Sequence, residues 1–452
     1  MRLITTLMLL FVVSCASSNP PVSKINEFVL HSVNIIDVAN QKLLADQAVF
    51  VRDGKITQVL QNDVEALPQD VPLIDGEDGY VTPGLIDMHV HMYEPAAYSI
   101  ALSHGVTHVR VMNGIAQQLN WRDAVQDGEL VGASSTVSSP IISAYDDAML
   151  HHTVHTAQAA RSAVRNYQQQ GYDLIKAYGN LSEEALLALV DEAKKIGIPV
   201  AKHGPHASGE LPVSTLAGLQ SFEHVEDIFQ GSLQYQFAPN ALPEVIQALH
   251  ATRVPVTPTL NIFYQLTRLS EQKQGYLDSI PQEYTSEIIA LEAKHNQVAR
   301  WLDASDNMAK HNRRTLKFLQ YITEQLHNAK VPLLVGSDSG VLLSPHGLAT
   351  HTEMALLHQS GLDSFAVLAA ATVNPANALG LNHTMGKIEA GYQADFIFSK
   401  GNPLQDLAVL KNPDAVSKLG TWYDSEALIE LRNQAIADRS LWAEISALWQ
   451  AL

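Results

Sequence analysis

The sequence has little cysteine and little charge. Its 452 residues contain a single cysteine, Cys15, which excludes a disulfide within the chain. Charged residues make up 17% of the chain and hydrophobic residues 46%, and no internal repeat is visible. A chain of this length and composition can bury a large core and is too long for a single small domain. We therefore expect a globular protein with more than one structural unit.

Positive charge is scarce as well. Lysine and arginine number 29 against 47 aspartates and glutamates, which gives a formal net charge of -18. Such a surface repels nucleic acid and anionic membranes, so neither is expected as a partner. We instead expect a small-molecule substrate, such as an amide or a dipeptide, and the sequence leaves open whether the chain forms a homo-oligomer.

No hydrophobic run at the start of the chain is long enough to span a bilayer. The apolar run Leu3 to Val13 follows a single positive charge, as in an export signal. It ends in Val12-Val13-Ser14-Cys15, which resembles the cleavage box of bacterial lipoproteins. We predict a signal peptide at 1–14 and a linker at 15–26 lipid-anchored through Cys15, in the bacterial periplasm or at the cell surface. An ordinary secretory signal cut nearby is the alternative.

Residues 27–80 show short alternating apolar runs separated by turn signals. The clearest turn is Arg52-Asp53-Gly54-Lys55 between two β-rich runs, a strong hairpin signal. This part is too small to be stable without support. Residues 385–425 supply a second strand-turn-strand pattern, with Gly386–Tyr392 as one run and Ala394–Phe398 as the other. We predict that both parts build one small β-sandwich domain, followed by a C-terminal helix at 426–452.

Between these parts, residues 81–384 alternate apolar β-branched runs with helical stretches, which is typical of repeated βα units around a parallel sheet. The eight expected strands end near His91, Met112, Ile142, Lys176, His203, His224, Thr257 and Asp338. Eight such units predict an α/β fold, a (β/α)8 TIM-like barrel. A capped amphipathic helix is expected from Ser182 to Lys195, and a helical insertion at 267–327 that could cover the barrel mouth.

Several of these strands end in polar side chains. In this fold the active site lies at the carboxyl ends of the strands. His89 and His91 are two positions apart on one strand, so both imidazoles face the same side and can hold one metal ion. Imidazole suits zinc and its first-row neighbours. The strand-end set is His89, His91, Lys176, His203, His224 and Asp338.

These segments resemble the metal-dependent amidohydrolase superfamily, and within it the imidazolonepropionase-like and prolidase-like branch. The resemblance covers nearly the whole predicted mature chain. It rests on Gly84–His91, Asp173–Tyr178, Ser221–His224, Gly336–Gly340 and the tail from Ala371 to Asp395.

The resemblance implies one or two divalent metal ions, with Zn²⁺ as the first choice. His89 and His91 would hold the more buried ion together with Asp338, and His203 and His224 would hold the second. Lys176 would be carboxylated and would bridge the two ions. Burial and nearby positive charge favour a neutral lysine, which is the form that reacts with carbon dioxide.

The implied reaction is hydrolysis of a carbon–nitrogen bond by metal-activated hydroxide, with Asp338 as proton shuttle. Xaa-Pro dipeptides and N-acyl amino acids are the first substrate candidates. A cyclic amidase, a deaminase or a catalytically silent metal-binding lipoprotein are the alternatives. Deaminases of this superfamily commonly lack the bridging lysine, so Lys176 argues against that alternative.

One stretch departs from the related enzymes. Prolidase-like members carry His-Ala-His-Gly where this chain has His203-Gly204-Pro205-His206, and we choose His203 as the ligand because it ends the apolar run. Tyr178, His206 and His346 are expected as substrate contacts, each with a packing or rim role as the alternative. The histidines His151, His152 and His155 are expected to be solvated.

Overall fold

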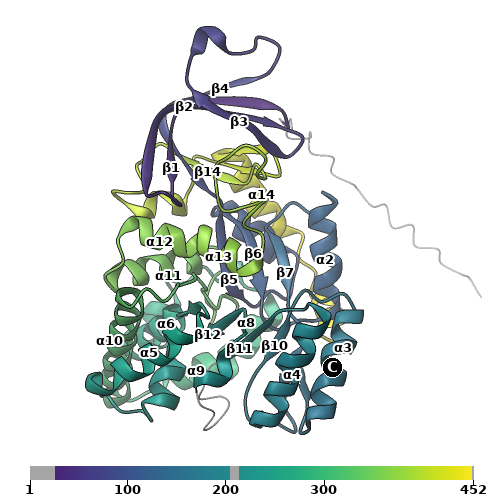
Figure 1. Cartoon of the computed structure of the whole chain (residues 1–452), viewed down its shortest axis with the longest axis vertical. Coiled ribbons are helices and arrows are strands. Elements are labelled where there is room, and N and C mark those ends of the chain that lie inside the picture. Colours follow the sequence, from purple (N-terminus) through teal and green to yellow (C-terminus); the bar gives the residue numbers. More distant parts are fainter. Residues whose placement is uncertain (1–25, 204–212, 450–452) are drawn as a thin grey trace, which may run out of the picture.

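The structure is a computed structural model that describes residues 26–203 and 213–449. The predicted signal peptide, the linker with Cys15 apart from Asn26, and His206 lie outside the described residues. Figure 1 shows a β domain at one end and a larger α/β body beneath it, connected where β4 (Leu73–Pro83) leads into β5 (Leu85–Val90).

The larger body is built around eight parallel β segments. Three of them form one sheet and four are neighbours in a second sheet: β5 (Leu85–Val90), β6 (Val106–Val111) and β7 (Ser134–Val137), then β10 (Ile175–Ala177), β11 (Val200–His203), β12 (Ser221–Glu223) and β13 (Val256–Thr257). A bridge from Ser138 to Leu174 joins the two sheets on one side. On the other side the eighth segment forms two isolated β-bridges. Its Leu333 pairs with Val256 of β13, and its Ser339 pairs with Val90 of β5. The ring is therefore closed, and the predicted barrel is confirmed.

Two barrel segments differ from regular strands. The eighth, predicted at 331–338, has isolated bridges instead of a continuous ladder. Its Gly336 packs so tightly that a Cβ there would lie 2.2 Å from Thr257 Cγ2 and 2.9 Å from His89 Cβ. The poorly marked third region contains β7 and β8 (Ile141–Ser143), and β9 (His151–Thr153) pairs with β8.

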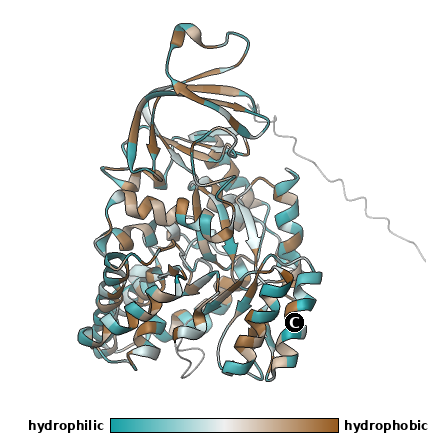
Figure 2. Cartoon of the chain, in the orientation of Figure 1, coloured by the Kyte–Doolittle hydropathy of each residue, from teal (hydrophilic) through white to brown (hydrophobic). Residues whose placement is uncertain are grey.

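Helices surround the barrel strands (Figure 1). Figure 2 shows that they carry both hydrophobic and hydrophilic residues, as expected when one face packs on the barrel and the other meets solvent. The predicted helix after Ser182 is confirmed as α4, with the Ser182 hydroxyl accepting a hydrogen bond from the Ala185 amide at 3.1 Å and Gly197 ending the helix at φ +76°. The α-helices of the barrel body outside the insertion and before the C-terminal pair are α1 (Ala96–Ser103), α2 (Ala116–Gln126), α3 (Ala157–Gln169), α4 (Glu183–Ile196), α5 (Leu242–Thr252), α11 (Leu348–Gln359), α12 (Ser364–Ala371) and α13 (Val373–Leu379).

The expected insertion between strands seven and eight is helical, and it begins earlier than predicted, at Leu260. It comprises α6 (Leu260–Gln272), α7 (Gln274–Leu277), α8 (Glu287–His295), α9 (Gln297–Leu302) and α10 (Asp306–Asn328). Its small hydrophobic core includes Leu343, from the loop after Asp338. The insertion thus packs against a loop of the barrel mouth. No helix in the described part of the chain is both long and apolar enough to cross a bilayer.

The β domain is one sheet of seven strands drawn from both parts of the chain. Its strands are β1 (Phe28–Asp37), β2 (Lys42–Arg52), β3 (Lys55–Gln61), β4 (Leu73–Pro83), β14 (Phe396–Ser399), β15 (Ala415–Lys418) and β16 (Thr421–Asp424). The predicted hairpin turn is present, with Asp53 and Gly54 at φ +51° and +76°. The segment 391–394 bonds both to β3 and to the β15–β16 turn, so the sheet folds around a core that contains Phe28 and Phe396.

Two predictions at the C-terminal part are wrong. Residues 386–392 form bends instead of a strand, because their backbone bonds join β3 only near 391–393. The single helix expected at 426–452 is two helices, α14 (Ser425–Ala437) and α15 (Leu441–Trp449). They are separated at 438–440, where the Ser440 hydroxyl accepts a hydrogen bond from the Ala443 amide at 3.4 Å and so begins a new helix.

Candidate active site

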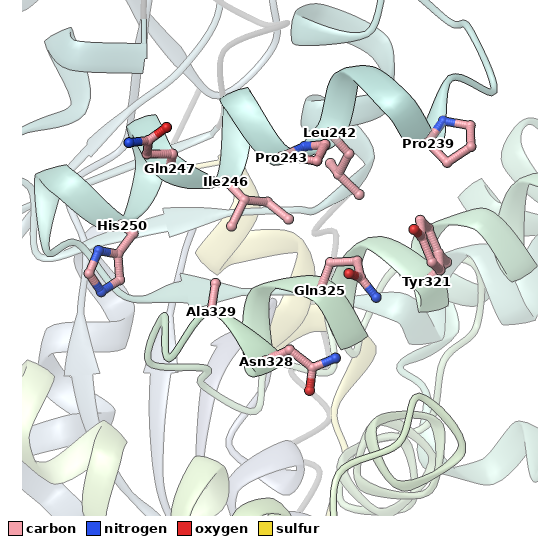
Figure 3. A pocket seen from close by; sticks show the side chains of 10 residues that line it. All are labelled: Pro239, Leu242, Pro243, Ile246, Gln247, His250, Tyr321, Gln325, Asn328 and Ala329. Atoms are coloured by element: carbon pink, nitrogen blue, oxygen red, sulfur yellow. The ribbon is translucent and has the colours of Figure 1, made fainter.

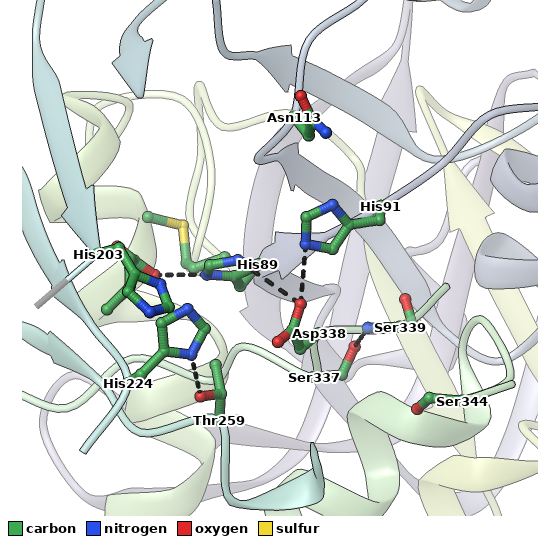
Figure 4. A network of polar contacts seen from close by, with 12 residues as sticks. His89, His91, Asn113, His203, His224, Thr259, Ser337, Asp338, Ser339 and Ser344 are labelled. Atoms are coloured by element: carbon green, nitrogen blue, oxygen red, sulfur yellow. Dashed lines mark hydrogen bonds and ion pairs between the residues drawn. The ribbon is translucent and has the colours of Figure 1, made fainter. Parts of the chain in front are cut away.

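Four histidines and one aspartate lie in a row at the carboxyl ends of the barrel strands. Figure 4 shows His203 and His224 at one end, His89 and Asp338 in the middle and His91 at the other end. The ring centroids of His203 and His224 are 4.2 Å apart, those of His224 and His89 4.7 Å, and those of His89 and His91 5.4 Å. The barrel therefore brings together residues that are far apart in the sequence.

His89, His91 and Asp338 form the tightest group. Asp338 Oδ1 lies 2.9 Å from His91 Nε2 and 3.6 Å from His89 Nε2. Burial would raise the pKa of Asp338, but the neighbouring His89, His91 and His224 hold it well below its usual range. Burial, followed by the charge of Lys176, lowers the pKa of His89 to about 4. An ionised carboxylate and a neutral imidazole are the states that bind a divalent metal, so these three residues are a candidate metal site.

His203 and His224 make up the second part of the row. His224 is buried and His203 is half-buried, and desolvation together with neighbouring positive groups holds both pKa values well below the usual range. The Thr259 hydroxyl lies 2.6 Å from His224 Nδ1 and fixes the orientation of that ring. Asp227 Oδ2 lies 3.4 Å from His203 Nε2, so a carboxylate stands beside this imidazole too. The sequence analysis did not single out Asp227 as a neighbour of His203.

Lys176 enters the barrel from β10 and has 2% of its surface exposed. Its Nζ has no hydrogen-bond partner among the described residues. Burial lowers the pKa of Lys176 to about 8, against the opposing charges of Glu223, Asp338 and Asp227. An ammonium group is costly in such a place. The neutral form that can react is therefore more populated near neutral pH than in an ordinary lysine.

Arg110 and Glu223, which the sequence analysis did not single out, support the row from inside the barrel. Both side chains are fully buried, and Arg110 Nη2 lies 2.7 Å from Glu223 Oε1. Arg110 also donates to the Met88 carbonyl at 2.7 Å. The second oxygen of Glu223 lies 2.8 Å from His89 Nδ1, which leaves His89 Nε2 facing Asp338. Arg110 and His89 lower the pKa of Glu223 well below its usual range, although burial alone would raise it.

Asp87 supports the same strand end. Its Oδ1 accepts from the backbone amides of Ser337 at 2.9 Å and His89 at 3.2 Å, and its Oδ2 accepts from the Thr350 hydroxyl at 2.6 Å. The first and eighth barrel segments are thereby fixed to each other. Asp338 is held in the left-handed backbone region at φ +54°, a strained conformation that occurs preferentially at functional sites.

The expected substrate contacts have different surroundings. Tyr178 follows β10, and its ring centroid lies 4.4 Å from that of His203 and 5.4 Å from that of His151. His346 is buried, and its Nδ1 lies 2.9 Å from the hydroxyl of Ser339, the residue that follows Asp338 in the chain. The expectation that His151 and His152 are solvated is wrong, because both are half-buried in β9, whereas His155 is exposed.

A hollow elsewhere on the body is separate from this row. The groove between α5 and α10 measures about 400 Å³ and is lined by Leu242, Ile246 and Tyr321 among others (Figure 3). None of the strand-end residues lines it. We therefore place the candidate active site at the barrel mouth and not in this groove.

Comparison with known proteins places this fold and site in context. A family model described as the amidohydrolase family matches residues 80–422. Imidazolonepropionase from Thermoplasma acidophilum is 20% identical over 405 residues, which cover 84% of this chain and 88% of the relative. A dihydroorotase from Anaeromyxobacter dehalogenans is 27% identical over 157 residues, 33% of this chain. The chain spans only 32% of that relative's length, and 11% of two further dihydroorotases.

Two solved structures share the fold. A bottromycin amidohydrolase aligns with a TM-score of 0.75 at 24% identity, covering 91% of this chain and 90% of the other. An Xaa-Pro dipeptidase with bound methionine aligns with a TM-score of 0.68 at 20% identity, covering 88% of this chain and all of the other. These likenesses support the arrangement of barrel and β domain.

Proposed function

Because the chain belongs to the amidohydrolase family, we propose that it is a metal-dependent hydrolase of a carbon–nitrogen bond in a small amide or dipeptide. Xaa-Pro dipeptides and N-acyl amino acids are the first substrates to test. The observation that carries the proposal is the row of four closely spaced imidazoles beside the ionised Asp338.

The residues fit one or two divalent ions, for which Zn²⁺ is our first choice. His89, His91 and Asp338 would hold one ion, and His203 and His224 a second. Lys176 would complete the set, because its buried Nζ has no partner among the described residues. Carboxylation would turn this Nζ into an anionic group that can bridge two cations. Bound ions would acidify a water molecule and polarise the substrate carbonyl.

The protein's own groups then move the proton. Asp338 accepts the proton of the attacking water and delivers it to the leaving nitrogen, as the new carbon–oxygen bond forms and the carbon–nitrogen bond breaks. Glu223 keeps His89 in the tautomer whose Nε2 faces the site. Tyr178 stays protonated because burial raises its pKa, so its phenol can donate a hydrogen bond to a substrate carbonyl or carboxylate.

The variant Asp338→Asn tests this role. It should lower turnover by about 10²–10⁴-fold, the usual contribution of a general acid–base group. Native protein and variant are compared with Xaa-Pro dipeptides, N-acyl amino acids and cyclic amides, and metal content is measured on each sample. Asp70→Asn, at an exposed position, is the matched control. Full turnover by Asp338→Asn with its metal in place would refute the proton-transfer role.

Two alternatives remain as outcomes of the same screen. Hydrolysis of cyclic amides alone would indicate a cyclic amidase. Metal binding without activity on any of these substrates would favour a silent metal-binding protein. The intact row and the adjacent Lys176 favour the hydrolase.

We also propose that the chain is exported and lipid-anchored through Cys15, on the basis of the Val12–Cys15 motif alone. Mass spectrometry of the N-terminus of native and Cys15→Ser protein tests it. An unmodified Cys15 in the native sample would contradict the anchor.

A further inference from the structure

A cavity of about 640 Å³ lies between the C-terminal helices α14 and α15 and the barrel helices α1 and α2. Part of its wall is the loop that follows β5, through Tyr93 and Glu94. None of the proposed metal ligands lines it, so it is separate from the row of histidines.

The cavity is acidic. Its lining includes four carboxylates, those of Glu94, Glu129, Asp438 and Glu444, and one cation, Arg439. Two of the guanidinium nitrogens bind one of these carboxylates, since Arg439 Nε and Nη2 lie 2.7 Å and 2.8 Å from the two oxygens of Glu94. Arg439 Nη1 donates to the Glu283 carbonyl. The other carboxylates therefore share no cation within the lining.

Glu444 is the carboxylate of the lining that most clearly lacks a hydrogen-bond partner among the described residues. It comes from the inner face of α15, only 5% of its surface is exposed, and its Oε2 has no hydrogen-bond partner among the described residues. Burying such an oxygen without a partner is costly. Burial raises the pKa of the nearby Glu94 to about 7, with Glu444 adding to the effect against the opposing Arg439. Two buried carboxylates thus lie near each other, and only Glu94 is bonded to the guanidinium.

The remaining walls are largely apolar. Trp121 of α2, Leu130, Leu431 of α14 and Ala443 of α15 contribute to them. A bare metal ion would leave this surface uncovered, whereas an organic cation can place its charge at a carboxylate and its apolar body against an aromatic ring.

We propose that this cavity is a binding site for an organic cation, with an ammonium or guanidinium group at Glu444 and an apolar or aromatic body against Trp121. The site does not depend on the hydrolytic reaction. Its occupant would contact Glu94 on the loop that leads away from His91, and so would border the barrel mouth.

Calorimetric titration of the full chain with 2-phenylethylammonium and with 2-phenylethanol, its uncharged counterpart, tests the proposal. The ammonium compound should bind at least about tenfold more tightly than the alcohol. Glu444→Gln should lower the affinity for the ammonium compound by at least about tenfold and leave that for the alcohol unchanged. Glu430→Gln, at an exposed position of α14, is the matched control and should bind as the native chain does.

A second variant distinguishes loss of the carboxylate charge from loss of α15 packing. Glu129→Gln, at an exposed position of the rim, should weaken binding of the ammonium compound without affecting the fold. The proposal is overturned if the ammonium compound does not bind, if both compounds bind equally, or if both variants retain native affinity. These measurements need no turnover, so they stand apart from the proposed hydrolysis.

Discussion

Glu223→Gln should destabilise the protein strongly, because it removes the counter-charge of a buried cation. Arg110 and Glu223 have no exposed side-chain surface, and their charged atoms are 2.7 Å apart. Removing one partner of a buried pair typically costs about 3–5 kcal/mol, since the other charge stays buried. The exposed pair Lys400–Glu77, 3.1 Å apart with side chains 62% and 68% exposed, should contribute about 0–1 kcal/mol. Glu77→Gln is therefore the matched control.

Urea unfolding of the two variants measures the difference. Glu223→Gln should lower the free energy of unfolding by at least about 2 kcal/mol more than Glu77→Gln does. It should also weaken metal binding by about 10–100-fold, because His89 loses the carboxylate that fixes its tautomer. Arg110→Met combined with Glu223→Gln should cost less than the two single changes added together. Equal stability losses in Glu223→Gln and Glu77→Gln would refute the reasoning.

Three further predictions follow from particular contacts. Gly336→Ala should displace the eighth barrel segment and lower metal content, because its methyl group would meet Thr257 Cγ2 at 2.2 Å; native metal content would contradict this. Lys176→Arg should bind one metal equivalent fewer than the native chain, because a guanidinium stays charged and cannot be carboxylated; elemental analysis decides. Burial lowers the pKa of His104 to about 3 and that of His351 to about 4. In the unfolded chain a histidine has a pKa near 6.5, so on acidification both histidines bind protons more readily in the unfolded chain than in the folded one. The free energy of unfolding should therefore fall as pH drops from about 6.5 to 4, by about 1.4 kcal/mol per pH unit for each histidine. Urea unfolding across this pH range measures the slope, and a flat profile would show that the two histidines do not act in this way.

The barrel could be predicted from the sequence because most of its strands are short apolar runs that end at a distinctive residue. The run before His203, for example, begins with apolar Val200 and Ala201, and the helix after Ser182 has its own start and end signals. The structure brings the six strand-end residues to one mouth, as the strand pattern suggested. Their roles as metal ligands stay a prediction.

Other features could not be predicted because they depend on contacts across the barrel. Glu223 is the last residue of an ordinary strand, and nothing near it in the sequence indicates that Arg110, 113 residues away, is its partner. The run 386–392 looks like a strand, but its neighbours are a hairpin and a turn that leave it no full ladder. The acidic cavity beside α15 likewise arises from helices that meet only in the folded chain.

Anomalous diffraction from crystals of the metal-loaded protein tests the central claim most directly. We predict a peak about 2.0–2.2 Å from the Nε2 atoms of His89 and His91 and from a carboxylate oxygen of Asp338. With a second ion, another peak should lie near His203 and His224, with extra density on the Nζ of Lys176. Metal bound elsewhere, with His89 and Asp338 free of it in fully loaded protein, would contradict the account.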